Sequence, residues 1–292
     1  MSRRSYLLFV LVGFLWGIPY LLIRIAIRDF NPAFIIFIRL VIGAAILIPV
    51  ALRQKSLNSA LRGFKYVLFY ACAEMIGPWF FITTAETKLA SGLTGLLVAT
   101  TPIWSTIFTS LMGDKTVWHH KRLFGLVLGF IGVAALVGIE GITGTSALWA
   151  IGYVLIAAIG YAYAVIMITQ KLPGVSGIAI NAVAMATSAV VYAPFAFVER
   201  PRGSLSPEAL LSLIGLGVLC TAGAFVAFFA LMRDIGPARG SLVTYLNTAF
   251  AVLLGVLILS EPFTLGMAIG LPMVLVGSYF ASRKPSSNKT EE

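Results

Sequence analysis

Residues 6–27 read YLLFVLVGFLWGIPYLLIRIAI, a stretch of 22 residues in which Arg24 is the one charged side chain. A helix needs about 20 predominantly apolar residues to cross the hydrocarbon core of a bilayer. Similar apolar blocks recur along the chain, roughly at residues 6–27, 32–52, 64–85, 90–111, 123–139, 147–169, 177–198, 210–232, 241–259 and 263–282. The sequence therefore predicts an all-α polytopic membrane protein with ten transmembrane helices.

The composition of the 292 residues agrees with this prediction. Charged residues make up 11% of the chain, less than half of the roughly 25% in soluble domains, and 59% are hydrophobic. The net charge of +10 comes from Lys and Arg in short gaps between apolar blocks, so we do not expect nucleic acid as a partner. Cys72 and Cys220 each lie inside an apolar block, which indicates neither a disulfide framework nor a thiolate metal site.

The distribution of Lys and Arg predicts the orientation in the membrane. Fifteen of these residues fall in gaps on one side of the predicted spans and five on the other, where Arg24, Arg28, Lys88, Arg200 and Arg202 lie. Because basic residues stay on the cytoplasmic side, both termini are expected in the cytoplasm. The expected location is the inner membrane of the cell. Residues 284–292 are expected to form a polar cytoplasmic tail.

The two halves of the chain resemble each other. A shift of 148 residues superposes several pairs, namely Cys72 on Cys220, Phe80 on Phe228, Phe81 on Phe229, Ala90 on Ala238, Gly92 on Gly240 and Thr100 on Thr248. Each half holds five predicted spans, an odd number, so the second copy would be inverted relative to the first. We therefore expect residues 1–145 and 146–283 to form two inverted five-helix repeats with a site near the membrane midplane.

Three motifs connect the chain with a known family. Gly13-Phe14-Leu15-Trp16-Gly17 lies in the first span, Pro102 in the fourth, and an acid followed by two glycines comes after spans 4 and 9, beginning at Asp114 and Glu261. This pattern resembles the drug/metabolite transporter superfamily, ten-span EamA type. The many aromatic residues at mid-membrane depth are most similar to those of the aromatic amino-acid exporters (YddG type). The resemblance implies a central cavity lined mainly by spans 1, 3, 4, 6, 8 and 9, alternating access, and no cofactor.

Trp16, Tyr20, Arg24 and Arg28 follow one another at intervals of four, which places them on one face of a helix. Trp16 lies ten residues past Tyr6 and therefore about 15 Å deep, too deep for the aromatic belt at the interface. It is a candidate for a substrate-binding wall, with Tyr20 beside it. The alternative is a packing Trp with two Arg side chains that reach the interface.

Other substrate-binding candidates lie in spans 4, 6 and 9. Trp104 follows the kink expected at Pro102, and Tyr161 and Tyr163 flank one position of span 6. Tyr245 and Asn247 lie in span 9, where the amide of Asn247 faces either a neighbouring helix or a wet cavity. Trp79 is only six residues from the outer end of span 3 and is expected in the interfacial belt.

Glu74 is the one carboxylate near the middle of a predicted span. A charged acid there costs at least about 2.5 kcal/mol, so it is a candidate functional residue. It could carry protons for coupling, contact a substrate amine, or form an ion pair with Arg39. Helix rise puts Arg39 and Glu74 at depths that differ by about 6 Å, with side chains leaning apart, which disfavours a direct pair.

The sequence favours a transporter over an enzyme. It has no phosphate-binding G-x-x-x-x-G-K-[ST] loop, and both histidines, His119 and His120, fall in one basic gap. We expect an exporter of small amphipathic metabolites, with aromatic or other large neutral amino acids favoured. A multidrug or lipophilic-cation exporter is the alternative, and an intramembrane enzyme or lipid-handling subunit is more remote. No metal or cofactor is expected, and a monomer is allowed.

Overall fold

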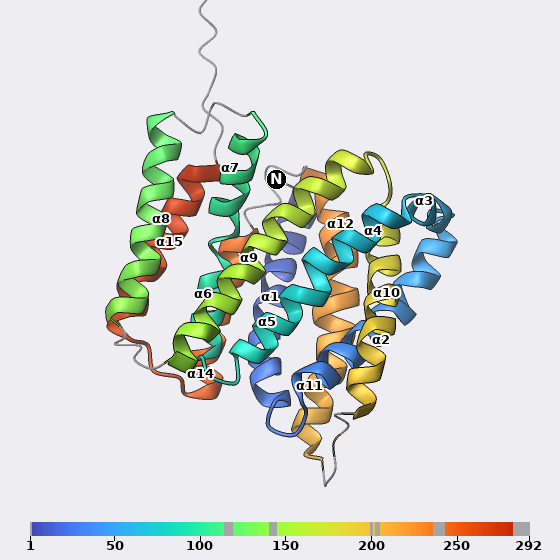
Figure 1. Ribbon diagram of the computed structural model, residues 1–292, viewed down its shortest axis with the longest axis horizontal. Coiled ribbons are helices and arrows are strands. Elements are labelled where there is room, and N and C mark those ends of the chain that lie inside the picture. Colours follow the sequence, from blue (N-terminus) through green and yellow to red (C-terminus); the bar gives the residue numbers. More distant parts are fainter. Residues whose placement is uncertain are drawn as a thin grey trace, which may run out of the picture.

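The computed structural model describes residues 2–113, 119–139, 145–198, 201, 205–235 and 243–282. Every regular element in these residues is a helix (Figure 1). Asp114, Ala238, Gly240 and the expected tail at 284–292 lie outside the described residues, so the structure tests nothing that was predicted for them.

The helices follow the predicted apolar blocks closely. In the first half these are α1 (Arg3–Ala26), α2 (Pro32–Arg53), α3 (Leu57–Arg62), α4 (Phe64–Ala71), η1 (Cys72–Ile76), α5 (Gly77–Ala85), α6 (Ser91–Val98), α7 (Thr101–Leu111) and α8 (His120–Ile139). In the second half they are α9 (Thr145–Lys171), α10 (Gly177–Val198), α11 (Pro207–Gly217), η3 (Val218–Gly223), α12 (Ala224–Ile235), α14 (Val243–Leu259) and α15 (Leu265–Ser282). The short helix α3 was not predicted.

Seven helical segments of the described chain are long and apolar enough to cross a membrane. Three of them are composite, because α4, η1 and α5 form one segment, α6 and α7 a second, and α11, η3 and α12 a third. The apolar helices α14 and α15 are shorter, and α8 is a further helix of 20 residues. The all-α membrane class is confirmed, whereas the count of ten spans stays a prediction.

The fourth predicted span is broken where a kink was expected. α6 ends at Val98, and α7 begins at Thr101 with Pro102 in its first turn. Proline lacks a backbone N–H, so the preceding turn cannot be continued by the regular hydrogen bond. Side chains take over instead, because the hydroxyls of Thr100 and Thr101 donate to the carbonyls of Leu97 and Val98, each at 2.7 Å.

Two π-helical segments interrupt long helices. Pro78 is the second residue of α5, just after η1, and it cannot donate to the carbonyl four residues earlier, so the wider turn accommodates it. Carbonyls in or next to these segments accept side-chain donors: the hydroxyl of Tyr192 donates to the carbonyl of Ile76 at 2.6 Å, and that of Thr221 to the carbonyl of Leu216 at 2.7 Å. The 148-residue shift brings η1 onto positions 220–224, which overlap η3, although sequence reasoning predicted neither segment.

Close helix contacts hold the two edges and the centre of the bundle together. α8 and α15 lie side by side at one edge, and α2 and α10 at the opposite edge (Figure 1). At the first edge a Cβ on Gly277 would lie 2.5 Å from the backbone nitrogen of Gly129. In the centre, α1 packs on α14 so closely that a Cβ on Gly17 would lie 2.5 Å from the Cβ of Phe250. Gly17 of the motif in span 1 is therefore a helix-packing residue.

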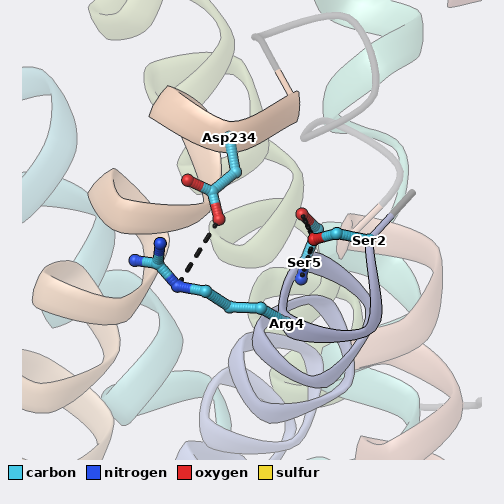
Figure 2. A network of polar contacts seen from close by, with 4 residues as sticks. All are labelled: Ser2, Arg4, Ser5 and Asp234. Carbon is cyan, nitrogen blue, oxygen red and sulfur yellow. Dashed lines mark hydrogen bonds and ion pairs between the residues drawn. The ribbon is translucent and has the colours of Figure 1, made fainter.

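The two ends of the bundle are joined by different contacts. Figure 2 shows that the start of α1 meets the end of α12, where Arg4 Nε lies 3.8 Å from Asp234 Oδ2. Ser2 caps α1, since its hydroxyl accepts from the Ser5 backbone N–H at 3.1 Å. At the other end of α1, Asp29 Oδ2 accepts from the backbone N–H of Ser206 at 2.8 Å. Hydrogen bonds from Ser206 lower the pKa of the Asp29 carboxyl.

Candidate functional site: a central cavity

A cavity of about 810 Å³ lies among the central helices. Its lining comes from α1, α2, α9, α10, α12 and α14, and from the composite segments α4–η1–α5 and α6–α7. In the described part of the chain, neither α8 nor α15 contributes a lining residue, which agrees with the resemblance, since spans 5 and 10 are not among the lining spans that it implies. The contributions of α2 and α10 were not expected from the resemblance.

Five of the candidates named from the sequence line this cavity together, namely Trp16, Tyr20, Glu74, Tyr161 and Asn247. The ring of Trp16 packs against two phenylalanines of α12, with centroid distances of 5.8 Å to Phe225 and 4.7 Å to Phe228. These contacts hold the indole in the cavity wall. Arg24, one turn beyond Tyr20, points elsewhere, because its guanidinium donates to the backbone carbonyl of Glu86.

The other three candidates do not line the cavity. Trp104 packs edge-on against Phe130 of α8, with ring centroids 5.6 Å apart, and its indole nitrogen is buried without a described partner. Tyr245 lies 6.4 Å from Tyr279 of α15, ring to ring. These two were expected at the substrate site, but each faces a peripheral helix instead.

Tyr163 differs from Tyr161 for a reason of helix geometry. Two residues along a helix turn the side chain by about 200°, so both tyrosines cannot face one cavity. Tyr163 instead packs edge-on against Phe69 of α4 and Phe108 of α7, at 5.7 Å and 5.3 Å between centroids.

The lining residues that sequence reasoning did not select as substrate-binding candidates include Arg39, Tyr70, Trp79 and Asn181. The expectation that Trp79 belongs to the interfacial belt is wrong, because its side chain is 5% exposed and lines the cavity. The hydroxyl of Tyr70 donates to Asn181 Oδ1 at 3.3 Å, and the Asn181 amide donates to the Gly177 carbonyl at 2.9 Å. Of these residues, Arg39 could have been selected from the sequence, because a basic residue deep in a span is a candidate functional residue.

Arg39 is held by a hydroxyl and an aromatic ring. Its Nε donates to Thr221 Oγ1 at 2.7 Å, and its guanidinium carbon lies 3.8 Å from the centroid of the Trp79 ring. Thr221 belongs to η3, so one π-helical segment supplies the neutral partner of this cation. Stacking on Trp is favourable for a guanidinium that is partly removed from water.

Glu74 belongs to the other π-helical segment, η1, and enters the same cavity. Its Oε2 is buried and has no hydrogen-bond partner among the described residues. The sole ion pair in that part of the chain joins Arg4 and Asp234. Arg39 and Glu74 thus share a cavity without forming a direct pair, as the helix geometry indicated.

The cavity has one exposed end and one end near a cluster of acids. At the exposed end it reaches the loop between α9 and α10, where Pro173 and Gly174 are exposed. On the other side its lining ends at Ile23 and Thr83, next to the end of α5, where Glu86 follows. Burial raises the pKa of the Glu86 carboxyl, and the negative charge of Glu261 raises it further. The positive charges of Arg24 and Arg39 oppose this shift.

The side chains available in and around the cavity indicate what it could bind. Across the described ranges, no group of three or more His, Cys, Asp or Glu side chains is arranged to hold a metal ion. The cavity instead combines an apolar aromatic wall with a few polar groups, as pockets for organic molecules do.

Comparison with known proteins gives a consistent result. The EamA-like transporter family matches the chain twice, at residues 3–138 and at residues 148–283. The transporter YoaV of Bacillus subtilis is 25% identical, with 92% of this chain and 93% of YoaV covered. The inner membrane transporter YedA of Escherichia coli K12 is also 25% identical, with 93% and 90% covered. Protein PagO of Salmonella typhimurium is 27% identical, with 92% and 88% covered.

A solved crystal structure shares the fold, with a TM-score of 0.69 at 16% identity over 97% of each chain. The family match covers nearly the whole chain, and the apolar helices surround one central cavity. This chain is therefore a multi-pass membrane protein that belongs to the EamA-like transporter family.

Proposed function

We propose that this transporter exports small amphipathic metabolites, in particular aromatic and other large neutral amino acids, by alternating access. The observation that carries the proposal is the cavity itself, which is lined by the aromatic rings of Trp16, Tyr20, Trp79 and Tyr161 and by the carboxyl of Glu74. Its volume of about 810 Å³ lies in the range of ligand pockets, roughly 300–1,000 Å³. Aromatic walls favour a flat apolar side chain, and the carboxyl favours an amine.

We further propose ten spans in two inverted five-helix repeats, residues 1–145 and 146–283, with both termini in the cytoplasm of an inner-membrane protein. The double match to one family and the 148-residue relation between η1 and η3 support the repeat. The bias of Lys and Arg supports the orientation. A reporter fused after Lys289 that is active only outside the cytoplasm would contradict it.

The exposed end of the cavity supports export as the direction of transport in this proposal. In this topology the loop between α9 and α10 faces the cytoplasm, so the cavity is open inward. At the opposite end Glu261 accepts from Ser91, Asp29 accepts from Ser206, and Arg24 binds the Glu86 carbonyl. An inward-open cavity can bind substrate from the cytoplasm, which is the first step of an export cycle.

Counterflow in proteoliposomes tests the proposal. Purified protein is reconstituted, the vesicles are loaded with unlabelled phenylalanine, tryptophan, leucine, serine or glutamate, and entry of labelled phenylalanine is measured. We expect the three large neutral amino acids to drive counterflow and the two small or acidic ones to fail. Equal counterflow with all five, or none with any, would reject the proposed substrate class.

A multidrug or lipophilic-cation exporter is the second candidate. The unpartnered Oε2 of Glu74, in a cavity that aromatic residues also line, favours it, because cations bind both carboxylates and ring faces. Tetraphenylphosphonium separates the two functions. If it is transported, its counterflow should exceed the passive permeation measured in protein-free vesicles, whereas an amino-acid exporter should show no excess over that control.

A further inference from the structure

Arg39 is a cation that the cavity leaves without a negative partner. It lies seven residues into α2, about 10 Å along the helix from Pro32, and lines the cavity. A charged side chain at such depth is costly unless it is paired. Its two partners, the Thr221 hydroxyl and the Trp79 ring, are both neutral.

No acid among the described residues forms an ion pair with Arg39. Glu74 enters the same cavity but makes no ion pair with Arg39. Glu86 acts on Arg39 only through its field and does not line the cavity. The other titratable groups whose charge states act on Arg39 are Tyr20, Tyr161 and Cys220, which are ordinarily neutral.

The guanidinium keeps donors for a ligand. An Arg side chain has five N–H donors in a fixed fork, and only the Nε–H of Arg39 has a described hydrogen-bond acceptor. Its terminal nitrogens are not among the buried polar atoms that lack a partner, so they are accessible from the cavity. A terminal edge of this kind binds a carboxylate through two parallel hydrogen bonds.

We propose that Arg39 binds the carboxylate of the transported substrate. Trp79 supports one face of the guanidinium and Thr221 fixes its Nε edge, so both are positioning residues. Glu74 then receives the amine of the same molecule, and the aromatic wall receives its side chain. The site selects zwitterionic amino acids and apolar carboxylates over lipophilic cations. This inference rests on the proposed function in using the same cavity, and it adds the group of the substrate that is recognised.

Four ligands with one ring and different charges test the assignment. Calorimetry on the purified full-length protein measures the affinity for phenylalanine, 3-phenylpropionate, phenylalaninamide and phenethylamine. The first two carry a carboxylate and the last two do not. We expect the wild-type protein to bind the carboxylates, and Arg39→Gln to weaken both by about tenfold to a hundredfold, as for other hydrogen bonds to charged groups. Phenethylamine should bind Arg39→Gln as well as wild type, or better.

Matched variants separate recognition from folding. Arg53 is exposed near the end of the same helix, so Arg53→Gln should leave all four affinities unchanged. Arg39→Lys keeps the charge and should recover part of the carboxylate binding. Thr221→Val keeps the arginine and should weaken only the carboxylates, by a few-fold. A melting curve for each variant shows whether it is folded.

The outcomes distinguish this inference from the proposed function. Wild-type protein that binds no carboxylate, or Arg39→Gln that weakens all four ligands equally, overturns the role of Arg39. If Arg39→Gln does not fold, the wild-type ligand preference and Thr221→Val decide the question in the same way. Binding of 3-phenylpropionate through Arg39 without binding or counterflow of any amino acid keeps the anchor and rejects the amino-acid substrate.

Discussion

The carboxylate of Glu261 accepts hydrogen bonds from the backbone N–H of Ser91 at 2.8 Å and from the Ser91 hydroxyl at 2.9 Å. It also accepts from the backbone N–H of Gly92 at 3.1 Å. These donors lie at the N-terminus of α6, where backbone N–H groups have no helical acceptor and a negative charge is favourable. An acid of the second half thus caps a helix of the first half. This capping explains why the motif after α14 begins with an acid.

Glu261→Ala is expected to destabilise the protein by about 1–3 kcal/mol, because it removes the acceptor of these hydrogen bonds and leaves α6 uncapped. The melting temperature of detergent-solubilised protein measures the loss. Glu208 is the matched control, since it is an exposed acid in the first turn of α11. Glu208→Ala should cost less than about 1 kcal/mol, and an equal loss for both variants would contradict the capping role.

Glu86→Gln is expected to stabilise the protein increasingly as the pH rises. Burial and the charge of Glu261 raise the pKa of the Glu86 carboxyl well above its ordinary value. A raised folded-state pKa means that the folded protein binds the proton more tightly than the unfolded chain, so stability falls as the pH increases above the unfolded value near 4.5.

Gln carries no titrating proton and escapes this loss. The melting temperatures of Glu86→Gln and wild type should therefore differ most near pH 8 and converge near pH 5. A constant difference across this range, or a variant that melts lower at pH 8, would show that Glu86 is not held protonated by its surroundings.

Trp16→Ala and Trp104→Ala are expected to have different effects, although both remove an indole at depth in the membrane. Trp16 lines the cavity, so its loss should weaken binding of aromatic substrates several-fold to about tenfold. Trp104 packs on Phe130 of α8, so its loss should lower the melting temperature and leave affinity per folded molecule unchanged. Equal losses of affinity would place Trp104 at the substrate site as well.

Most of the helix positions could be predicted from the sequence, because long apolar blocks between charged gaps leave a chain in lipid little alternative to helices. The side-chain directions were harder to predict. A depth argument selected Trp16 and Trp104 alike, yet it carries no information on which neighbour each residue faces.

Two features of the cavity could not be predicted from the apolar pattern of the sequence. The π-helical turns at Cys72–Ile76 and Val218–Gly223 shift the register of their helices, and they carry Glu74 and Thr221. Trp79 lies near a predicted helix end, where a belt residue is the common outcome. In the structure Trp79 contacts Arg39 instead. The two residues are 40 positions apart and belong to different spans, so their contact could not be read from the sequence.

Glu74→Gln tests how transport is driven, because Gln keeps the shape and hydrogen bonding of the side chain but cannot titrate. If Glu74 carries protons, the variant should lose the response of transport to an imposed pH gradient and keep substrate exchange. If Glu74 contacts the substrate amine, the variant should instead weaken phenylalanine and phenethylamine and spare 3-phenylpropionate. Proteoliposomes with and without a gradient measure the first effect, and calorimetry measures the second.

The position of Glu74 makes us expect the second result. Its unpartnered Oε2 shares a cavity with Arg39, which suits a ligand that carries both charges. Glu74→Ala serves as the control for packing, since it removes both the charge and the volume. If Glu74→Gln matched wild type in both assays while Glu74→Ala merely melted lower, Glu74 would be a polar link between helices. Transport would then proceed as facilitated diffusion without coupling at this residue.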